Sequence, residues 1–207
     1  MGVISIYIVL AYLLGSIPTA VWVGKSWYKI DVREHGSKNS GATNTFRVLG
    51  KKPGIVVLLI DVIKGVLAVT FPYFLDFASW GSDELIQLQL ILGILAVIGH
   101  IFPVFAGFNG GKGVATSLGI VIGIHPFAAL VCLGVFLIVF ILSSYVSLGA
   151  ILAAVTFPFS VHFLFQNQNF YLLLFSILLS LAVILAHKAN IQRIVNGEEN
   201  KMRLFGK

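Results

Sequence analysis

Six long apolar windows, separated by short polar segments, constrain this chain more than any other feature. A helix needs about 20 apolar residues to cross a bilayer. The chain is 58% hydrophobic and only 11% charged, whereas soluble domains are about 45–50% apolar and about 25% charged. We therefore expect an all-α, polytopic integral membrane protein. The windows lie near residues 3–24, 54–75, 85–105, 114–142, 146–165 and 170–187.

The fourth window, 114–142, is too long for one ordinary span, and a His125-Pro126 pair interrupts it. The residue before a proline disfavours helical geometry. One tilted, kinked helix is one interpretation, and a short helix followed by a full one is the other. The distribution of charge favours the second. We predict helices at about 113–124 and about 126–142, with His125 in the turn between them.

Basic residues gather in two segments, and an acidic segment lies between them. Lys and Arg collect in cytoplasmic loops. If segment 25–53 is cytoplasmic, the N-terminus is outside, and only seven spans then place the basic C-terminal tail inside. We therefore predict one domain, 1–207, of seven transmembrane helices, with its N-terminus outside, its C-terminus cytoplasmic and a first helix that is not a cleaved leader. The first basic segment contains Lys25, Lys29, Arg33, Lys38, Arg47, Lys51 and Lys52, the tail contains Lys188, Arg193, Lys201, Arg203 and Lys207, and the acidic segment contains Asp76, Asp83 and Glu84.

A polar loop at 36–47 follows the first apolar window and reads Gly-Ser-Lys-Asn-Ser-Gly-Ala-Thr-Asn-Thr-Phe-Arg. It contains no acid and two bases. Glycine lets backbone N–H groups approach a ligand closely, and hydroxyls, amides and an Arg supply further donors. This inventory favours a phosphate bound at the membrane surface.

A second polar segment, Gly110-Gly111-Lys112-Gly113, is rich in glycine and is expected to lead into a helix. A helix N-terminus carries unpaired N–H groups and partial positive charge, which suit an anion. A tight turn with a snorkelling Lys is the alternative, but the neighbouring 36–47 loop favours an anion site. A Walker A loop needs Gly at position 106 and Ser or Thr at 113. The chain has Ala106 and Gly113 there, so a nucleotide hydrolase is disfavoured.

A third polar element lies at the end of the last apolar window. His187, Asn190 and Arg193 follow at i, i+3 and i+6 and share one broad helix face. Histidine can donate, accept or move a proton near neutral pH. An amphipathic helix end at the lipid headgroups is the alternative. In the seven-span topology all three polar elements lie at the cytoplasmic face.

Other polar residues lie within or beside the apolar windows. Charges inside a span usually pair or face the bundle interior, so we expect Asp61 and Lys64 to form a structural ion pair. His100 is either a donor that supports the 107–113 segment or a packing residue, and Ser147 is a further candidate for the site. The single cysteine, Cys132, excludes an internal disulfide. We expect no metal or other cofactor, and the net charge of +6 follows from topology rather than from nucleic-acid binding.

Three motifs together characterise the chain. They are Gly36-Ser-x-Asn-x-Gly-Ala-Thr-Asn-x-x-Arg47, then Gly99-His-x-Phe-Pro-Val-Phe with Gly110-Gly-Lys-Gly-Val-Ala-Thr116, then His187-x-x-Asn190-Ile-x-Arg193 with Gly197-x-Glu199-Asn200. In order and spacing they resemble the bacterial acyl-phosphate:glycerol-3-phosphate acyltransferase family. The resemblance implies a seven-helix inner-membrane enzyme. Its reaction would transfer a fatty acyl group from acyl phosphate to the 1-hydroxyl of glycerol 3-phosphate, giving lysophosphatidic acid and phosphate, the first acylation of phospholipid synthesis.

Two other kinds of protein fit the sequence less well. The other large group of glycerolipid acyltransferases relies on a His-x-x-x-x-Asp pair, and no His of this chain has Asp five residues later. A membrane carrier for an organic phosphate is the rival class. Carriers keep their site near the bilayer midplane, whereas the polar motifs here are all expected at one face.

We predict the following roles for individual residues. Acyl phosphate is bound by Ser37, Thr43, Gly110, Gly111, Lys112, Gly113 and Ser147, and glycerol 3-phosphate by Arg47, Lys112, His187, Asn190 and Arg193. The catalytic residues are His187, Asn190, Lys112 and Arg47, supported by Asn39, Asn44, His100 and Glu199. Either His187 or a substrate phosphate oxygen accepts the hydroxyl proton, and transfer is direct rather than through an acyl-enzyme. Glu199 either orients a base or draws the tail over the site.

The expected surroundings of the enzyme follow from the same resemblance and topology. Its partners are the two substrates, the membrane lipid and, as a further candidate, the upstream enzyme that makes acyl phosphate. No nucleic acid is expected, and the protein is expected to be a monomer. Its place is the bacterial plasma (inner) membrane, with the active site at the cytoplasmic face.

Overall fold

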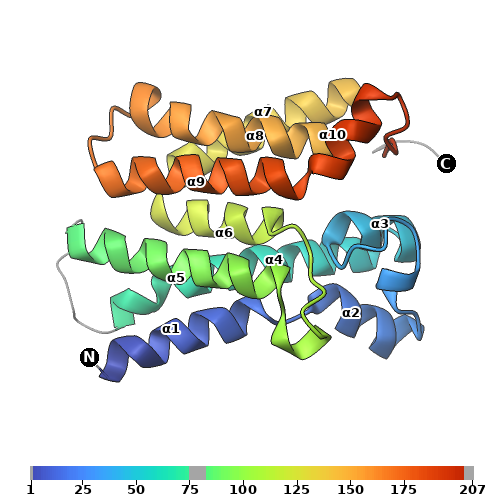
Figure 1. The fold of residues 1–207 in the computed structure, drawn as a ribbon, viewed down its shortest axis with the longest axis horizontal. Helices are drawn as coiled ribbons and strands as arrows, with labels where there is room; N and C mark the ends of the chain where they lie inside the picture. Colours follow the sequence, from blue (N-terminus) through green and yellow to red (C-terminus); the bar gives the residue numbers. More distant parts are fainter. Residues whose placement is uncertain (1, 75–82, 203–207) are drawn as a thin grey trace. The chain divides into compact units, whose positions relative to one another are not determined.

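The computed structural model describes residues 2–74 and 83–202, and every regular element within these ranges is helical (Figure 1). Asp76, Arg203 and Lys207, which entered the charge argument, lie outside the described residues. The chain divides into two compact units, Met1–Ile124 and His125–Lys207. The all-α class expected from the apolar windows is therefore confirmed.

Four helical stretches are long and apolar enough to cross a membrane, and two bent pairs raise the number to six. The short apolar helix α6 (Val114–Ile124) has only 11 residues. Four to six candidate spans confirm a polytopic membrane protein, while the count of seven and the orientation stay predictions. The four stretches are Lys51–Phe74, Asp83–Ala106, Pro126–Ser143 and Val146–Leu164, and the bent pairs are Ile4–Gly15 with Thr19–Tyr28 and Phe170–Ala186 with Lys188–Val195.

The first apolar window is not one helix, as predicted, but two. Helix α1 (Gly2–Gly15) is followed by α2 (Thr19–Val23) and a π-helical turn, η1 (Gly24–Tyr28). The two arms meet at a bend of 46°. Pro18 lies in the break, and a proline both lacks the N–H that a helix needs and disfavours helical geometry in the residue before it.

The segment 36–47 is only partly a loop, which corrects a second expectation. A 3-10 turn, η2 (Val32–Glu34), precedes it, and helix α3 (Ala42–Leu49) contains its second half. Gly41 is the N-cap of α3, with extended backbone, and the eight residues that follow contain neither glycine nor proline. Gly50, whose φ is +96°, ends α3, and α4 (Lys51–Thr70) begins directly after it.

The long fourth window is split as predicted. Helix α6 ends at Ile124, and α7 (Pro126–Ser143) begins after His125. His125 caps α7, because its Nδ1 accepts a hydrogen bond of 3.2 Å from the backbone N–H of Ala128. The second unit continues with α8 (Val146–Phe159), its π-helical end η5 (Ser160–Leu164), α9 (Phe170–Ala186) and α10 (Lys188–Val195). Of the polar stripe, His187 thus lies at the bend and Asn190 and Arg193 lie on a separate helix, bent by 59° from α9.

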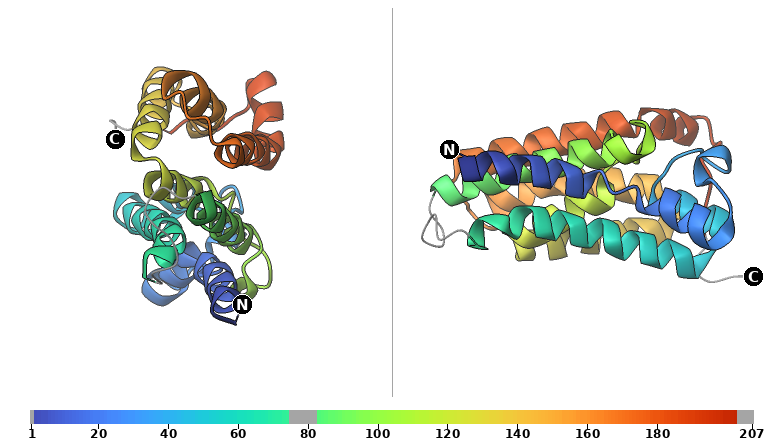
Figure 2. Two further views of the ribbon diagram at one scale, coloured as in Figure 1. Left: turned by 90° about the vertical axis from the view of Figure 1, so that its left-hand side faces the viewer. Right: turned by 90° about the horizontal axis from the view of Figure 1, so that it is seen from below.

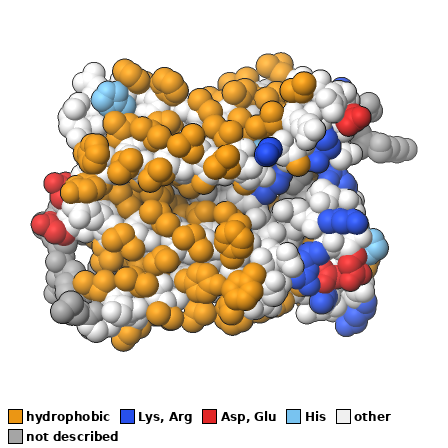
Figure 3. All heavy atoms as spheres, in the orientation of Figure 1, with side chains coloured by type: hydrophobic (Ala, Val, Ile, Leu, Met, Phe, Trp, Pro, Cys, Tyr) orange, Lys and Arg blue, Asp and Glu red, His pale blue; other side chains and the backbone are white. Residues whose placement is uncertain are grey.

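Glycines bring the helices of the first unit close together around α5 (Asp83–Ile101) and α6 (Figure 2). A Cβ on Gly65 of α4 would meet the carbonyl oxygen of Thr116, and one on Gly119 of α6 would meet that of Val62. Small residues allow such close backbone approach in membrane helix pairs. In this unit, apolar side chains cover the helix bodies, and Lys and Arg gather at the end that carries α2 and α3 (Figure 3).

Candidate active site

Asn44 folds the first polar segment onto α3. Its Nδ2 donates to the carbonyl oxygens of Val32, at 2.8 Å, and His35, at 3.1 Å, while its Oδ1 accepts from the backbone N–H of Ser37 at 2.8 Å. The side chain is buried, so all of its hydrogen-bonding groups serve the turn. These contacts fit the supporting role predicted for Asn44.

The same turn leaves several predicted ligands near the surface. Ser37 and Arg47 are exposed, and Thr43 and Asn39 are half-buried. The Arg47 guanidinium has no hydrogen-bond or ion-pair partner within residues 2–74 and 83–202. The backbone N–H groups in the first turn of α3 lack intrahelical acceptors. The segment can therefore present a cation, hydroxyls and N–H groups to an anion.

The glycine-rich segment forms a strap that is held against the end of α5; we call residues 110–113 the glycine strap. The N–H of Gly110 donates to the carbonyl of Ile101, and that of Gly111 donates to the carbonyl of His100, both at 3.1 Å. Gly113 has a φ of +78°, which is accessible to glycine and strained for other residues. Helix α6 begins at the next residue. The predicted turn into a helix is thus confirmed, with Lys112 half-buried within it.

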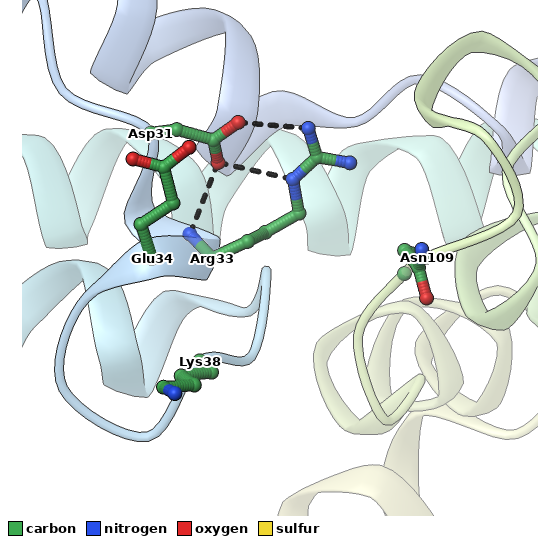
Figure 4. Close-up of a pocket in the computed structure, with 6 residues that line it drawn as sticks. Asp31, Arg33, Glu34, Lys38 and Asn109 are labelled. Carbon is green, nitrogen blue, oxygen red and sulfur yellow. Dashed lines mark hydrogen bonds and ion pairs between the residues drawn. The ribbon is translucent and has the colours of Figure 1, made fainter.

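Arg33, which precedes the 36–47 segment, is bonded to Asp31 (Figure 4) and to Ala106, which precedes the glycine strap; this link was not predicted from the sequence. Its Nε and Nη2 donate to the two carboxylate oxygens of Asp31, at 3.0 and 2.8 Å, and its Nη1 donates to the carbonyl of Ala106 at 2.8 Å. Ser40 adds a second link by donating to the carbonyl of Asn109 at 3.4 Å. The Asp31-x-Arg33 spacing was the only feature of the sequence that pointed to this link. The distant acceptor is a backbone carbonyl, which every residue has, so no residue type marks it.

An open cavity of about 460 Å³ lies beside this link. The Arg33 guanidinium holds the pKa of Asp31 well below its usual range, with burial opposing and Lys25, 3.1 Å from Asp31, assisting. Asp31 is therefore a permanent anion that is already paired. The cavity is lined by Asp31, Arg33, Glu34, Lys38, Asn109 and Gly110.

In the second unit, His187 lies at the bend between α9 and α10. It is buried, and its Nδ1 is 2.8 Å from the carbonyl oxygen of Val183. A carbonyl oxygen only accepts, so Nδ1 carries the proton. In a neutral ring, Nε2 is then the nitrogen that can take a proton from another group.

Glu199 joins three predicted site residues of the second unit. It accepts hydrogen bonds from Asn190 Nδ2 at 2.7 Å, Ser147 Oγ at 2.8 Å and Arg193 Nε at 2.8 Å. Burial raises the pKa of Glu199, but these hydrogen bonds outweigh it and leave the pKa below its ordinary value. Of the two roles considered for Glu199, the contacts fit the one in which it draws the tail over α8 and α10.

Each unit therefore assembles its own set of the predicted residues. Within residues 2–74 and 83–202, no group of three or more His, Cys, Asp or Glu side chains is placed to hold a metal ion. The first unit contains Ser37, Asn39, Thr43, Asn44, Arg47, His100, Gly110, Gly111, Lys112 and Gly113, and the second contains Ser147, His187, Asn190, Arg193 and Glu199.

The family profile described as glycerol-3-phosphate acyltransferase matches residues 5–197. The chain belongs to the glycerol-3-phosphate acyltransferase family. Relatives of that name include one from Chlorobaculum tepidum, 44% identical over 97% of this chain and 96% of its own, and one from Streptococcus pyogenes, 43% identical over 94% and 91%. The family expected from the motifs is thus confirmed, and with it an acyltransferase.

Two solved structures of another family member resemble this acyltransferase closely. They are crystal structures of PlsY (YgiH), an integral membrane glycerol 3-phosphate acyltransferase, in a glycerol 3-phosphate form and a lysophosphatidic acid form. Each is 35% identical and covers 97% of this chain, with TM-scores of 0.84 and 0.82 and with 96% and 95% of the PlsY chain aligned. The likeness confirms that this acyltransferase is an integral membrane protein.

Proposed function

We propose that this acyltransferase takes its acyl group from acyl phosphate and transfers it to the 1-hydroxyl of glycerol 3-phosphate. The products are lysophosphatidic acid and phosphate, and the step is the first acylation of phospholipid synthesis. The observation that carries the proposal is the pairing of two anion-suited segments in the first unit, one ending in Arg47 and the other centred on Lys112. Two segments suit a reaction in which both substrates carry phosphate. The forms in which PlsY was solved, with glycerol 3-phosphate and with lysophosphatidic acid, support the acceptor and the product.

The acyl-phosphate head is assigned to hydroxyls and glycine N–H groups around Lys112. A lysine between glycines offers a point charge beside backbone donors, which suits a tetrahedral phosphate. Ser147 is a further candidate for this set, and its hydroxyl donates to Glu199 at 2.8 Å. The residues are Ser37, Thr43, Gly110, Gly111, Lys112, Gly113 and Ser147.

Glycerol 3-phosphate is assigned to Arg47, Lys112, His187, Asn190 and Arg193. The planar fork of Arg47 can bind two phosphate oxygens at once. Arg193 uses its Nε on Glu199, and a guanidinium has four further N–H donors on its two terminal nitrogens. Glu199 thus orients cationic and amide donors without being a ligand of the anion itself.

The chemistry follows from an already activated donor. The 1-hydroxyl oxygen bonds to the carbonyl carbon of acyl phosphate, the bond from that carbon to the phosphate oxygen breaks, and phosphate leaves with the bonding electrons. The hydroxyl proton passes to His187 Nε2 or to a phosphate oxygen. The enzyme contributes mainly by positioning two anions and offsetting their repulsion, so transfer is direct. Mass spectrometry of protein given acyl phosphate alone tests this, because an acyl adduct that chases into product on adding glycerol 3-phosphate would contradict it.

The proposed setting is the bacterial inner membrane, with the site at the cytoplasmic face of a seven-helix monomer. The concentration of Lys and Arg in segment 25–53 supports this orientation. The upstream enzyme that makes acyl phosphate is a candidate partner. Membership of an acyltransferase family favours the enzyme over the alternative of an organic-phosphate carrier.

The deciding experiment uses purified protein in lipid bilayers with palmitoyl phosphate and glycerol 3-phosphate. Phosphate release and lysophosphatidic acid are measured, and palmitoyl-CoA is the control donor. Product from palmitoyl phosphate but not from palmitoyl-CoA is the expected result. Product from palmitoyl-CoA alone would show that the donor is a different one. If folded protein gives no product from either donor, the organic-phosphate carrier becomes the favoured function.

A further inference from the structure

A charged network lies buried among the apolar helices of the first unit. Asp61 on α4 is 1% exposed, and its Oδ1 accepts from Thr19 Oγ1 at 3.0 Å and lies 2.9 Å from Lys64 Nζ. Lys64 Nζ also donates to the carbonyl of Ile17 at 3.0 Å. The ion pair expected from the sequence is thus confirmed. Charges at such positions are costly and are characteristically tied to function.

The network continues from Asp61 to His100 at the end of α5. The Nδ1 atom of His100 lies 3.8 Å from Asp61 Oδ1 and 3.2 Å from Thr116 Oγ1 of α6. Both His100 and Thr116 are buried. This ring nitrogen is therefore within hydrogen-bonding distance of α6 and lies near the carboxylate on α4.

The opposite side of the His100 ring packs against the glycine strap. A Cβ built on Gly111 would collide with His100 Nε2, and its three nearest heavy atoms all belong to that ring. The carbonyl of His100 also accepts the N–H of Gly111 at 3.1 Å. His100 thus touches Gly111 on one side of Lys112 in the sequence and Thr116 on the other.

We propose that His100 is a positioning residue for phosphate binding by the glycine strap. The contact of His100 Nδ1 with Thr116 Oγ1 fixes the ring on the first turn of α6, beside the buried Asp61–Lys64 pair, and the ring packs against the strap through Nε2. The position of Lys112 is thereby fixed, because Gly111 before it and Thr116 after it both contact His100. The inference rests on the proposed binding of a substrate phosphate by this strap, and His100 itself touches no substrate.

Two amide substitutions at His100 test the contacts of its two ring nitrogens separately. His100→Asn keeps a polar group near the place of Nδ1 but removes the part that packs on Gly111, whereas His100→Gln reaches toward Gly111. The control is Gln89→Leu, on the same helix and also buried, whose Nε2 donates to the Val69 carbonyl at 2.9 Å and contacts Tyr73 Oη at 3.0 Å. At 1.5 Å per residue, Gln89 lies about 16 Å along α5 from His100.

All variants are assayed in lipid bilayers with palmitoyl phosphate and glycerol 3-phosphate, together with their melting temperatures. We expect His100→Asn to raise the KM of a phosphate-bearing substrate by about 10- to 100-fold, since small misplacements have effects of that size, and His100→Gln to restore part of the loss. Gln89→Leu should lower the melting temperature and leave both KM values unchanged. If His100→Asn behaves like Gln89→Leu, His100 is only a packing residue and the inference is overturned.

A double-mutant cycle tests the contact itself. Gly111→Ala should impair KM in the wild-type background, because its Cβ meets the ring, and should do much less harm in the His100→Ala background, where the ring is gone. Contacting residues are non-additive in this way. Equal losses in both backgrounds would contradict the proposal.

Lys112→Met distinguishes failure of the inference from failure of its premise. A normal KM for both substrates in Lys112→Met would show that the strap does not bind phosphate. The positioning role of His100 would then be contradicted as well. An impaired Lys112→Met beside His100 variants with normal KM overturns the positioning role alone. Impairment of both supports the inference.

Discussion

The two units hold their polar residues in different ways. In the first unit, the glycine strap is fixed by backbone hydrogen bonds to α5, and Arg47 is left without a partner among the described residues. In the second unit, one carboxylate, Glu199, joins three side chains from two helices. Backbone bonds do not titrate, whereas a carboxylate hub does. We therefore expect the backbone bonds of the glycine strap to be insensitive to pH and the attachment of the tail to depend on the charge of Glu199.

His187→Ala should have the largest effect and would locate the chemistry in the second unit. General-base catalysis contributes about 100- to 10,000-fold, so kcat should fall by that factor if Nε2 accepts the proton. Steady-state kinetics with both substrates varied is the measurement. A loss confined to the KM of glycerol 3-phosphate would assign His187 to binding and leave the proton to the substrate phosphate.

Arg47→Lys should affect binding rather than chemistry, which sharpens the contrast between the units. A lysine carries the charge but cannot copy the planar fork on phosphate. The KM of glycerol 3-phosphate should rise about tenfold, equivalent to about 1.4 kcal/mol. Lys52→Arg, at the exposed start of α4, is the control and should behave as wild type. Unchanged kinetics in Arg47→Lys would remove this residue from the site.

Glu199→Gln should loosen the second unit selectively. Hydrogen bonds to charged groups contribute about 1.5–3 kcal/mol, and Gln also replaces one acceptor oxygen by a donor that would face Asn190, Ser147 or Arg193. Hydrogen exchange should rise at the backbone of residues 196–202 and stay unchanged in the glycine strap. Glu198→Gln, at the exposed neighbouring position, is the matched control. Equal exchange in the two variants would show that the hub does not hold the tail.

Acidification should reproduce the effect of Glu199→Gln. The pKa of Glu199 is lowered in the folded protein, so its stabilisation is complete above the unfolded value, about 4.3, and is lost as pH falls through the folded value. Hydrogen exchange of the tail, corrected for its intrinsic pH dependence, should therefore be constant near neutral pH and rise only below the unfolded value. Loss of protection between pH 6 and 7 would identify a different group as the hub.

Arg33→Lys should have the smallest effect. The new lysine would keep the charge beside Asp31, and ion pairs near the surface contribute only about 0–1 kcal/mol. A lysine lacks the planar fork with which Arg33 binds both Asp31 oxygens and the Ala106 carbonyl together. We expect the KM of glycerol 3-phosphate to rise about twofold, within that range of energies, with kcat unchanged. Kinetics identical to wild type, with the same melting temperature, would show that the link to Ala106 does not order the two segments.

The sequence alone determined the class of protein and its family. Apolar windows are summed over many residues, so they predicted the membrane helices even where single boundaries were wrong. Proline and glycine act locally, and this is why the break at His125-Pro126 and the turn at the glycine strap were predicted. Pro18 carries the same local signal within the first window, but the apolar length of that window is sufficient for one span and masks the break.

Only the tertiary structure decided which groups meet. Arg33 and the Ala106 carbonyl are 73 residues apart, and Ser147 and Glu199 are 52 apart. A carbonyl acceptor is the same in every residue, so no sequence pattern marks it. His100 shows the same limit: its identity suggested either a donor or a packing residue, and the fold placed its Nδ1 beside Thr116 and its Nε2 beside Gly111. Long-range contacts depend on how helices approach one another, and local residue patterns do not encode that approach.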